Sequence, residues 1–187
     1  MILSVLEQHL DTISQLKGLT QEIATIAKTC SQALKAGKRI YLMGNGGSAA
    51  DSQHIAAEFV GRFQIERQPL PALAFTTDTS LLTAVGNDYG FDEVFARQVR
   101  AFVQPGDVVI GISTSGNSGN ILKAMACAQE QGGVTIAFTG QGGGKLANCC
   151  DYCLAVPSPV TARVQEAHIL IGHIICQYVD EVLYGAQ

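Results

Sequence analysis

The sequence has few charges and no long apolar run. Charged residues make up only 15% of the 187 residues, and no cluster of lysine or arginine stands out in a chain of net charge −4. The basic surface of a nucleic-acid reader is therefore absent, and we expect no nucleic-acid partner. The N-terminus carries acidic residues and lacks the basic segment of a signal peptide. The apolar runs are far shorter than the ~20 residues that span a bilayer, so we expect a cytoplasmic protein with no membrane partner.

Cysteine is present, but without a second pair that would complete a metal site. The six cysteines include one CxxC motif, formed by Cys150 and Cys153. A structural zinc site needs more ligands than this pair offers, and a redox motif would open a helix after a strand. We interpret all six as reduced, mostly buried thiols.

The apolar spacing changes along the chain from helical to strand-like. Residues 1–36 carry leucine and isoleucine at helical spacing, which predicts two helices that break at Gly18 and end at Gly37. Five short apolar runs then predict buried strands, at 39–43, 72–75, 107–112, 134–138 and 152–156. Helical patterns lie between and after them, at 48–63, 78–86, 91–103, 118–131, 143–148 and 161–184.

This alternation predicts a single α/β domain of three layers, a five-stranded parallel sheet flanked by helices, with the N-terminal helices added to it. Ligands of such sheets bind at the carboxyl ends of the strands. The chain contains no internal repeat. Its apolar content of 47% is high for a lone small domain, which favours burial of some surface between subunits.

The first predicted strand leads directly into the segment GNGGSAAD (44–51) and then a helix. Gly44, Gly46 and Gly47 permit positive φ and close backbone approach, and Ser48 can cap the helix. The segment fails the dinucleotide fingerprint because an alanine stands at the last glycine position, and it lacks the Lys-Ser/Thr pair of a nucleotide P-loop. It is either a substrate-contacting loop or a plain strand-to-helix turn.

A second polar loop, STSGNSGN (113–120), follows the third predicted strand. It places four hydroxyl groups at a helix N-terminus, those of Ser113, Thr114, Ser115 and Ser118. Backbone N–H groups and the helix dipole favour an anion there. Because the loop has no fixed positive charge, it suits a phosphate monoester held by neutral donors. A capping turn would need only one hydroxyl, so we favour phosphate binding.

Two helices hold the groups best suited to proton or metal chemistry. His54 and Glu58 are four residues apart on one face of the helix after the glycine loop, which suits a shared metal ion or a base with an orienting neighbour. Gln165 and His173 lie on the last helix, but ~12 Å of helix separates their backbones. One ion is therefore hard to reach from both within one chain.

The remaining polar positions are open to simpler readings. His9 and His168 are expected to be ordinary, partly buried histidines. Asn87 and Asp88 follow the 78–86 helix in a polar turn, which either binds sugar hydroxyls or only reverses the chain.

Four motifs together resemble the phosphoheptose isomerase branch of the sugar isomerase (SIS) fold, namely GNGGSAADSQHIAAEFVGR, TAVGNDYG, GISTSGNSGN and RVQEAHILIGH. The resemblance covers nearly the whole chain in order. It implies a homotetramer with active sites between subunits, in which residues 1–36 serve oligomer packing and residues 37–187 form the α/β core. It also implies interconversion of D-sedoheptulose 7-phosphate and D-glycero-D-manno-heptose 7-phosphate, the first step towards nucleotide-activated heptoses for lipopolysaccharide or other surface glycans.

The resemblance also implies roles for individual positions. The phosphate-binding loop corresponds to Ser113, Thr114, Ser115 and Ser118. Positions that contact the substrate are Asn45, Gly46, Gly47, Glu58, Asn87, Asp88 and Gln165. The catalytic pair corresponds to Glu58 and His173. Zinc-binding members hold one zinc ion per active site at the positions of His54, Glu58, Gln165 and His173.

Ketose-to-aldose isomerisation moves a proton between C1 and C2 through an enediolate, and this needs a base over that edge of the sugar. Glu58 is the expected base, and His173 is expected to exchange protons with the sugar oxygens. A zinc ion would polarise the carbonyl group. If Glu58 also binds zinc, it acts as a base only after a carboxylate shift or a substrate-induced movement. The sequence leaves both arrangements open.

Three alternatives share the fold. One is a relative without enzymatic activity, the initiator-associating protein of bacterial replication, and another is an isomerase of a different phosphosugar. The third is a ligand-sensing SIS domain, but such domains usually accompany a DNA-binding region, which this chain lacks. The competent residues at Glu58, Gln165 and His173 favour an enzyme.

Overall fold

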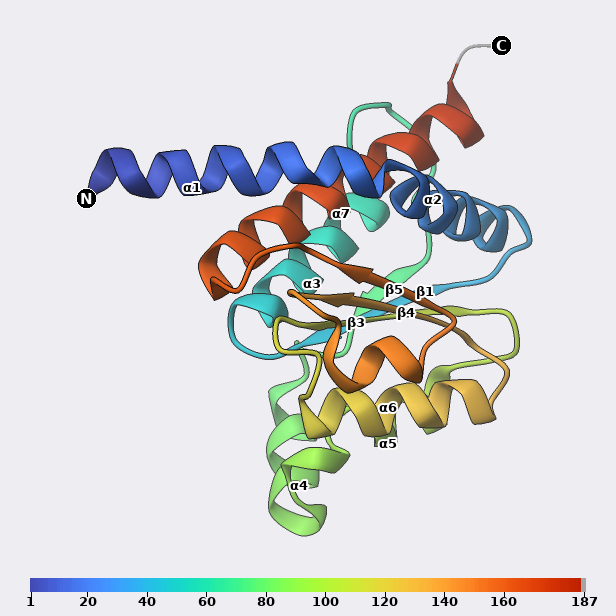
Figure 1. The fold of residues 1–187 in the computed structure, drawn as a ribbon. Helices are drawn as coiled ribbons and strands as arrows, with labels where there is room; N and C mark the ends of the chain where they lie inside the picture. Colours follow the sequence, from blue (N-terminus) through green and yellow to red (C-terminus); the bar gives the residue numbers. More distant parts are fainter. Residues whose placement is uncertain (186–187) are drawn as a thin grey trace.

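The computed structural model describes residues 1–185 and has the expected α/β architecture, shown in Figure 1. Five parallel strands form one sheet in the order β2-β1-β3-β4-β5. Their bounds are β1 (Ile40–Gly44), β2 (Ala72–Ala74), β3 (Val108–Ser113), β4 (Val134–Thr139) and β5 (Tyr152–Ala155). In register, Ile40 of β1 lies between Ala72 of β2 and Val108 of β3.

Helices cover both faces of the sheet, because alternate strand residues point to opposite sides. Ile40 and Leu42 belong to one buried cluster, with α2 (Thr20–Lys35), α3 (Gly47–Val60) and α7 (Thr161–Tyr184). Tyr41 and Met43 belong to a second cluster, with α5 (Ala96–Phe102) and α6 (Gly119–Glu130). The helix α1 (Ile2–Gln15) lies across α7 and extends beyond the body of the molecule (Figure 1), while α4 (Thr79–Tyr89) projects from the opposite side.

The structure corrects several predicted boundaries. The break at Gly18 is a short 3₁₀ turn, η1 (Leu16–Leu19). The predicted helix over 91–103 is divided into η2 (Phe91–Glu93) and α5, and the one over 143–148 is the 3₁₀ helix η3 (Gly144–Asn148). Three successive glycines at 142–144 all have positive φ, which leaves room there for only a tight turn.

Two corrections bear on candidate site residues. The helix α3 begins at Gly47, with Gly46 as N-cap, so Ser48 lies within the first turn and does not cap it. The helix α4 continues to Tyr89, so Asn87 and Asp88 lie in its last turn and not in a turn beyond it. Gly90, with φ of +91°, ends that helix.

The fold bears on two further expectations. No helix within residues 1–185 is both long and apolar enough to pass through a membrane. All six cysteines are free thiols, of which Cys30, Cys127 and Cys176 are buried and the other three half-buried.

Candidate active site

The two polar loops lie side by side at the point where the strand order of the sheet reverses. From β1 the chain passes through α3 to β2 on one side, whereas β3 is the neighbour of β1 on the other side. The glycine loop follows the carboxyl end of β1, and the hydroxyl-rich loop follows the carboxyl end of β3. This is the place in an open parallel sheet where a crevice for ligands forms.

The glycine loop is built by close backbone packing. Gly46 has φ of +56°, and a Cβ at Gly44 would lie 2.5 Å from the carbonyl oxygen of Ser48. A side chain at either position would strain or displace the start of α3. Of the three glycines, Gly46 alone has positive φ, while Gly44 and Gly47 serve close approach.

A pair of asparagines joins the two loops. Asn45 donates to Asn120 over 2.9 Å, and Asn120 donates back to the Asn45 side-chain oxygen over 2.8 Å. Asn120 is buried in the first turn of α6, and its oxygen also accepts the backbone N–H of Ile121. Asn120 ends the GISTSGNSGN motif but is not among the residues predicted for the site. Its position fixes the Asn45 side chain relative to the hydroxyl-rich loop.

The hydroxyl-rich loop is ordered by its own polar groups. The Ser113 and Ser118 hydroxyl oxygens are 2.9 Å apart, and the Ser115 hydroxyl accepts the backbone N–H of Asn117. Gly116 has φ of +65°, and a Cβ there would lie 2.0 Å from the carbonyl oxygen of Gly143. The loop is thus packed against the segment before η3.

A cavity of about 300 Å³ lies beside this loop. Its lining is Thr114, Ser115, Gln141, Ser158, Pro159, Thr161 and Val164. The N-terminus of α7 begins at Thr161, so the cavity has a helix N-terminus on a second side. Hydroxyl groups and backbone N–H groups around such a space suit an anion.

His54, Glu58 and His173 come together in one chain. The Nε2 atom of His54 lies 3.0 Å from a carboxylate oxygen of Glu58 and 3.1 Å from Nε2 of His173. One ligand atom from each residue lies within 4.8 Å of the other two. The His54 side chain is 49% exposed and that of Glu58 is 24% exposed, so the cluster is open to a small molecule. Phe63 stacks on the His173 ring from one side.

These three side chains fit a zinc ion. Two imidazole nitrogens and a carboxylate oxygen are ligands that zinc accepts, and tetrahedral ligands at 2.0–2.1 Å from the ion are roughly 3.3 Å apart. The separations of 3.0 and 3.1 Å are close to that value. The fourth residue predicted for the metal, Gln165, lies on α7 near the start of α3. Its amide lies against Gly47, where a Cβ would come within 2.6 Å of it.

Asn87 and Asp88 are exposed at the end of α4, and the Asn87 amide donates to the Asp88 carboxylate over 2.8 Å. No contact joins them to the histidine cluster or to the hydroxyl-rich loop among the hydrogen bonds of residues 1–185. Asp51, which is not among the predicted site residues, lies three residues before His54 on α3. One of its carboxylate oxygens is buried without a partner in the described part of the chain, and this burial raises the pKa of Asp51, while His54 opposes the rise.

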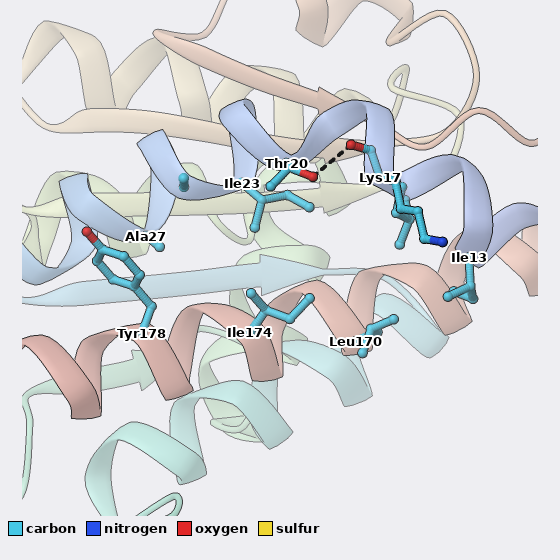
Figure 2. A pocket seen from close by; sticks show the side chains of 10 residues that line it. Ile13, Lys17, Thr20, Ile23, Ala27, Leu170, Ile174 and Tyr178 are labelled. Carbon is cyan, nitrogen blue, oxygen red and sulfur yellow. Dashed lines mark hydrogen bonds between the residues drawn. The ribbon is translucent and has the colours of Figure 1, made fainter. Parts of the chain in front are cut away.

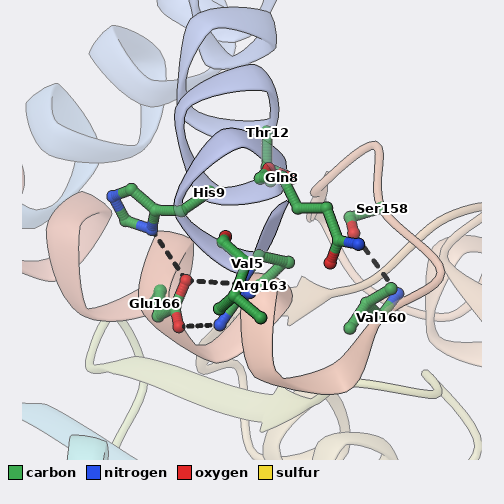
Figure 3. Close-up of polar contacts among 8 residues, drawn as sticks. All are labelled: Val5, Gln8, His9, Thr12, Ser158, Val160, Arg163 and Glu166. Atoms are coloured by element: carbon green, nitrogen blue, oxygen red, sulfur yellow. Dashed lines mark hydrogen bonds and ion pairs between the residues drawn. The ribbon is translucent and has the colours of Figure 1, made fainter. Parts of the chain in front are cut away.

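The turn of α7 that carries Gln165 is fixed to α1 (Figure 3). The Glu166 carboxylate accepts hydrogen bonds from Arg163, and one of its oxygens lies 2.7 Å from Nδ1 of His9. Arg163 also donates to the carbonyl oxygen of Val5. The Arg163 guanidinium, with His9, lowers the pKa of the Glu166 carboxyl. His9 is half-buried, as expected, and is also a hydrogen-bonding partner of Glu166.

His168 is more buried than expected. Its side chain is fully enclosed, with Nε2 3.0 Å from the carbonyl oxygen of Thr139 at the end of β4. Burial lowers the pKa of His168 to about 4, so the ring is neutral at pH 7. It joins α7 to the sheet and takes no part in the exposed cluster.

Comparisons with known proteins agree with one another. The family model for the SIS domain matches residues 6–140. The chain is 56% identical over 163 residues to a phosphoheptose isomerase of Aquifex aeolicus, covering 87% of this chain and 85% of that protein. It is 50% identical over 175 residues to one of Akkermansia muciniphila, covering 94% and 93%. The solved structure of a phosphoheptose isomerase from Neisseria gonorrhoeae superposes with a TM-score of 0.92 at 44% identity, covering 96% and 97% of the two chains.

Proposed function

The chain belongs to the SIS domain family and, within it, to the phosphoheptose isomerases, and we propose that His54, Glu58 and His173 form its catalytic centre. It is an aldose–ketose isomerase of a phosphorylated sugar, and its reaction interconverts D-sedoheptulose 7-phosphate and D-glycero-D-manno-heptose 7-phosphate. Nothing in the comparisons supports the alternative of an initiator-associating protein. The observation that carries the proposed centre is the convergence of three proton-transfer groups from two helices, of which His54 is exposed and Glu58 and His173 are half-buried.

We assign the binding of the sugar phosphate to the hydroxyl-rich loop. Ser113, Thr114, Ser115 and Ser118 offer neutral donors at the N-terminus of α6, where the helix dipole favours a phosphate group. Asn45, Gly46 and Gly47 flank the loop, and Asn87, Asp88 and Gln165 are assigned to the sugar hydroxyls. In these roles the loops determine the orientation of the sugar chain.

The proton transfer itself is assigned to Glu58. As a carboxylate it can take a proton from C1 of the ketose to form the enediolate, and as a carboxylic acid it can then protonate C2. His173 transfers a proton to or from the sugar oxygens and assists ring opening. His54, 3.0 Å from the Glu58 carboxylate, orients it.

A zinc ion would be held by His54, Glu58 and His173, with Gln165 as a ligand only if it comes from another subunit. Bound zinc supplies Lewis-acid polarisation of a carbonyl oxygen. If Glu58 is a ligand, it would act as the base only after a carboxylate shift or a substrate-induced movement. Whether the reaction requires zinc at these residues is tested by removal of the metal.

The active sites are proposed to lie between subunits of a homotetramer. An apolar groove of about 400 Å³ lies between the N-terminal helices and α7, with Leu170, Ile174 and Tyr178 on its α7 side (Figure 2). The α1 side chains Leu3, Leu6 and Leu10 are more than half exposed. Such apolar surface favours the packing of residues 1–36 against other subunits, beside the α/β core of 37–187.

We place the enzyme in the cytoplasm, at the first step towards nucleotide-activated heptoses for lipopolysaccharide or other surface glycans. The test of the function is incubation of the purified protein with sedoheptulose 7-phosphate, followed by measurement of the aldose product. Parallel samples contain added zinc or a chelator. Fructose 6-phosphate and unphosphorylated sedoheptulose test chain length and the phosphate. Turnover of the phosphorylated heptulose alone supports the proposal, and turnover of fructose 6-phosphate only would replace its substrate.

A further inference from the structure

A buried ion pair connects the segment after α3 to the last helix. The Nε atom of Arg67 lies 2.6 Å from a carboxylate oxygen of Asp180, and both side chains are only 1% exposed. Arg67 belongs to the loop between α3 and β2, and Asp180 lies on α7. Neither residue is among those assigned to substrate binding or proton transfer. Two charges this deeply buried are retained only where every polar atom has a partner.

The remaining donors of Arg67 bind the end of α3. One terminal nitrogen donates to the carbonyl oxygen of Phe59 over 2.8 Å, and the other donates to that of Glu58 over 3.0 Å. The last carbonyl groups of a helix have no partner within the helix, and a cation there is favoured by the helix dipole. Arg67 therefore holds the backbone of the very residue proposed as the base.

Asp180 completes the connection from the other helix. Its second carboxylate oxygen accepts the backbone N–H groups of Gln64 and Ile65, at 3.1 and 3.2 Å. Asp180 follows His173 by seven residues, which is two helical turns, so both project from nearly the same face of α7. The pair thus links the Glu58 backbone to the helix that carries His173.

We infer that Arg67 and Asp180 are positioning residues, which hold the turn of Glu58 at a fixed distance from His173. The inference rests on the proposed function of Glu58 and His173. Neither Arg67 nor Asp180 touches the sugar, because both are enclosed. Their effect on the reaction is expected through geometry, where a misplacement of about 1 Å costs about 10²-fold in rate.

The variant Arg67→Lys tests this inference. Lysine keeps the positive charge beside Asp180, but its single nitrogen cannot reach the carboxylate and both carbonyl groups in the fixed fork of a guanidinium. We expect kcat to fall about 10²-fold while KM changes by no more than about 3-fold, because the phosphate loop is untouched. An unchanged kcat in a folded protein would overturn the inference.

A matched control separates positioning from stability. Asp107 is equally buried and also accepts two backbone N–H groups, those of Arg39 and Gln104, but it lies at the amino ends of the strands. Asp107→Asn is expected to lower the melting temperature without changing kcat. If it lowers kcat as much as Arg67→Lys does, both effects come from lost stability and the inference fails. If Arg67→Lys does not fold, Asp180→Asn, which keeps the side-chain shape, is measured in its place.

Hydrogen exchange of the backbone amides over 58–62 gives a readout independent of turnover. We expect faster exchange of these amides in Arg67→Lys than in the wild type, and no change there in Asp107→Asn. Absence of turnover in the wild-type protein would overturn the proposed function, and the exchange result would still decide whether Arg67 holds this turn. Equal exchange in all three proteins would overturn the inference.

Discussion

Two polar clusters join α3 to α7, and they differ in exposure. His54, Glu58 and His173 are partly open to solvent, whereas Arg67 and Asp180 are enclosed. The open cluster has spare hydrogen-bonding capacity and can bind a ligand or exchange protons. The charges of the enclosed pair neutralise each other and its oxygens already accept hydrogen bonds, so the pair can only fix the position of the backbone around it. The residues assigned to the reaction and the residues that position them are thus two separate clusters, both between the α3 region and α7.

The largest expected effect comes from the open cluster. Glu58→Gln keeps the size of the side chain but removes the base, so kcat should fall about 10²- to 10⁴-fold. The melting temperature and oligomeric state should stay those of the wild type, because the side chain is partly exposed. The assay is turnover of sedoheptulose 7-phosphate, with Glu66→Gln in the exposed loop as the control. Near-normal activity of Glu58→Gln would remove Glu58 from the mechanism.

Substitution within the enclosed pair should lower the free energy of unfolding. Asp180→Ala leaves the Arg67 charge buried without its partner, and we expect the free energy of unfolding to fall by about 3–5 kcal/mol. Urea denaturation at a fixed protein concentration measures this. The exposed pair of Arg62 and Glu66 is the control, and Glu66→Ala should cost at most ~1 kcal/mol. Similar losses for the two variants would mean that enclosure gives the Arg67–Asp180 pair no special weight.

A buried histidine on α7, His168, extends the comparison to pH. The pKa of His168 is about 4 in the folded protein, against 6.5 for an ordinary histidine. Between these pH values the unfolded chain binds a proton at His168 that the folded chain does not. The contribution of His168 to the free energy of unfolding is therefore fully present above about pH 6.5 and is lost as the pH falls towards 4. The loss from this group is about 3 kcal/mol. His168→Gln should flatten the dependence of the unfolding free energy on pH, and an unchanged slope would contradict this origin.

The smallest expected effect lies outside both clusters, in the phosphate loop. Ser115→Ala removes one hydroxyl from the proposed phosphate site, and a hydrogen bond to a charged group contributes ~1.5–3 kcal/mol. We therefore expect KM to rise about tenfold or more while kcat changes little. Competition by inorganic phosphate should weaken in parallel, which identifies the phosphate group as the cause. Equal KM values for variant and wild type would exclude Ser115 from the phosphate contacts.

The sequence predicted the layers and the sheet because the apolar runs and helical patterns alternate clearly. It also indicated the three residues of the open cluster, through a four-residue spacing and a resemblance. The enclosed pair left no such signal. Arg67 and Asp180 are 113 residues apart, and Arg67 stands in a loop that reads as ordinary polar surface. Only the packing of the loop against α7 shows that these charges are buried together.

Asn87 and Gln165 show the same limit in the site itself. A helical pattern does not predict its last turn well, so Asn87 was expected in a turn beyond α4. The position of Gln165 against Gly47 depends on how α7 crosses α3. The angle at which two helices cross depends on how their side chains pack, and it cannot be predicted from the residue spacing of one helix.

The central claim, that Glu58 moves a proton through an enediolate, is tested most directly in heavy water. Sedoheptulose 7-phosphate is converted by the wild-type protein in D₂O, and the recovered aldose and ketose are analysed by NMR. We predict deuterium at C2 of the aldose and at C1 of the returned ketose, because the protonated carboxyl exchanges with solvent. Glu58→Gln should show neither conversion nor deuterium. Aldose formed over many turnovers without deuterium at C2 would contradict the account, because the hydrogen would then have moved directly between the two carbons.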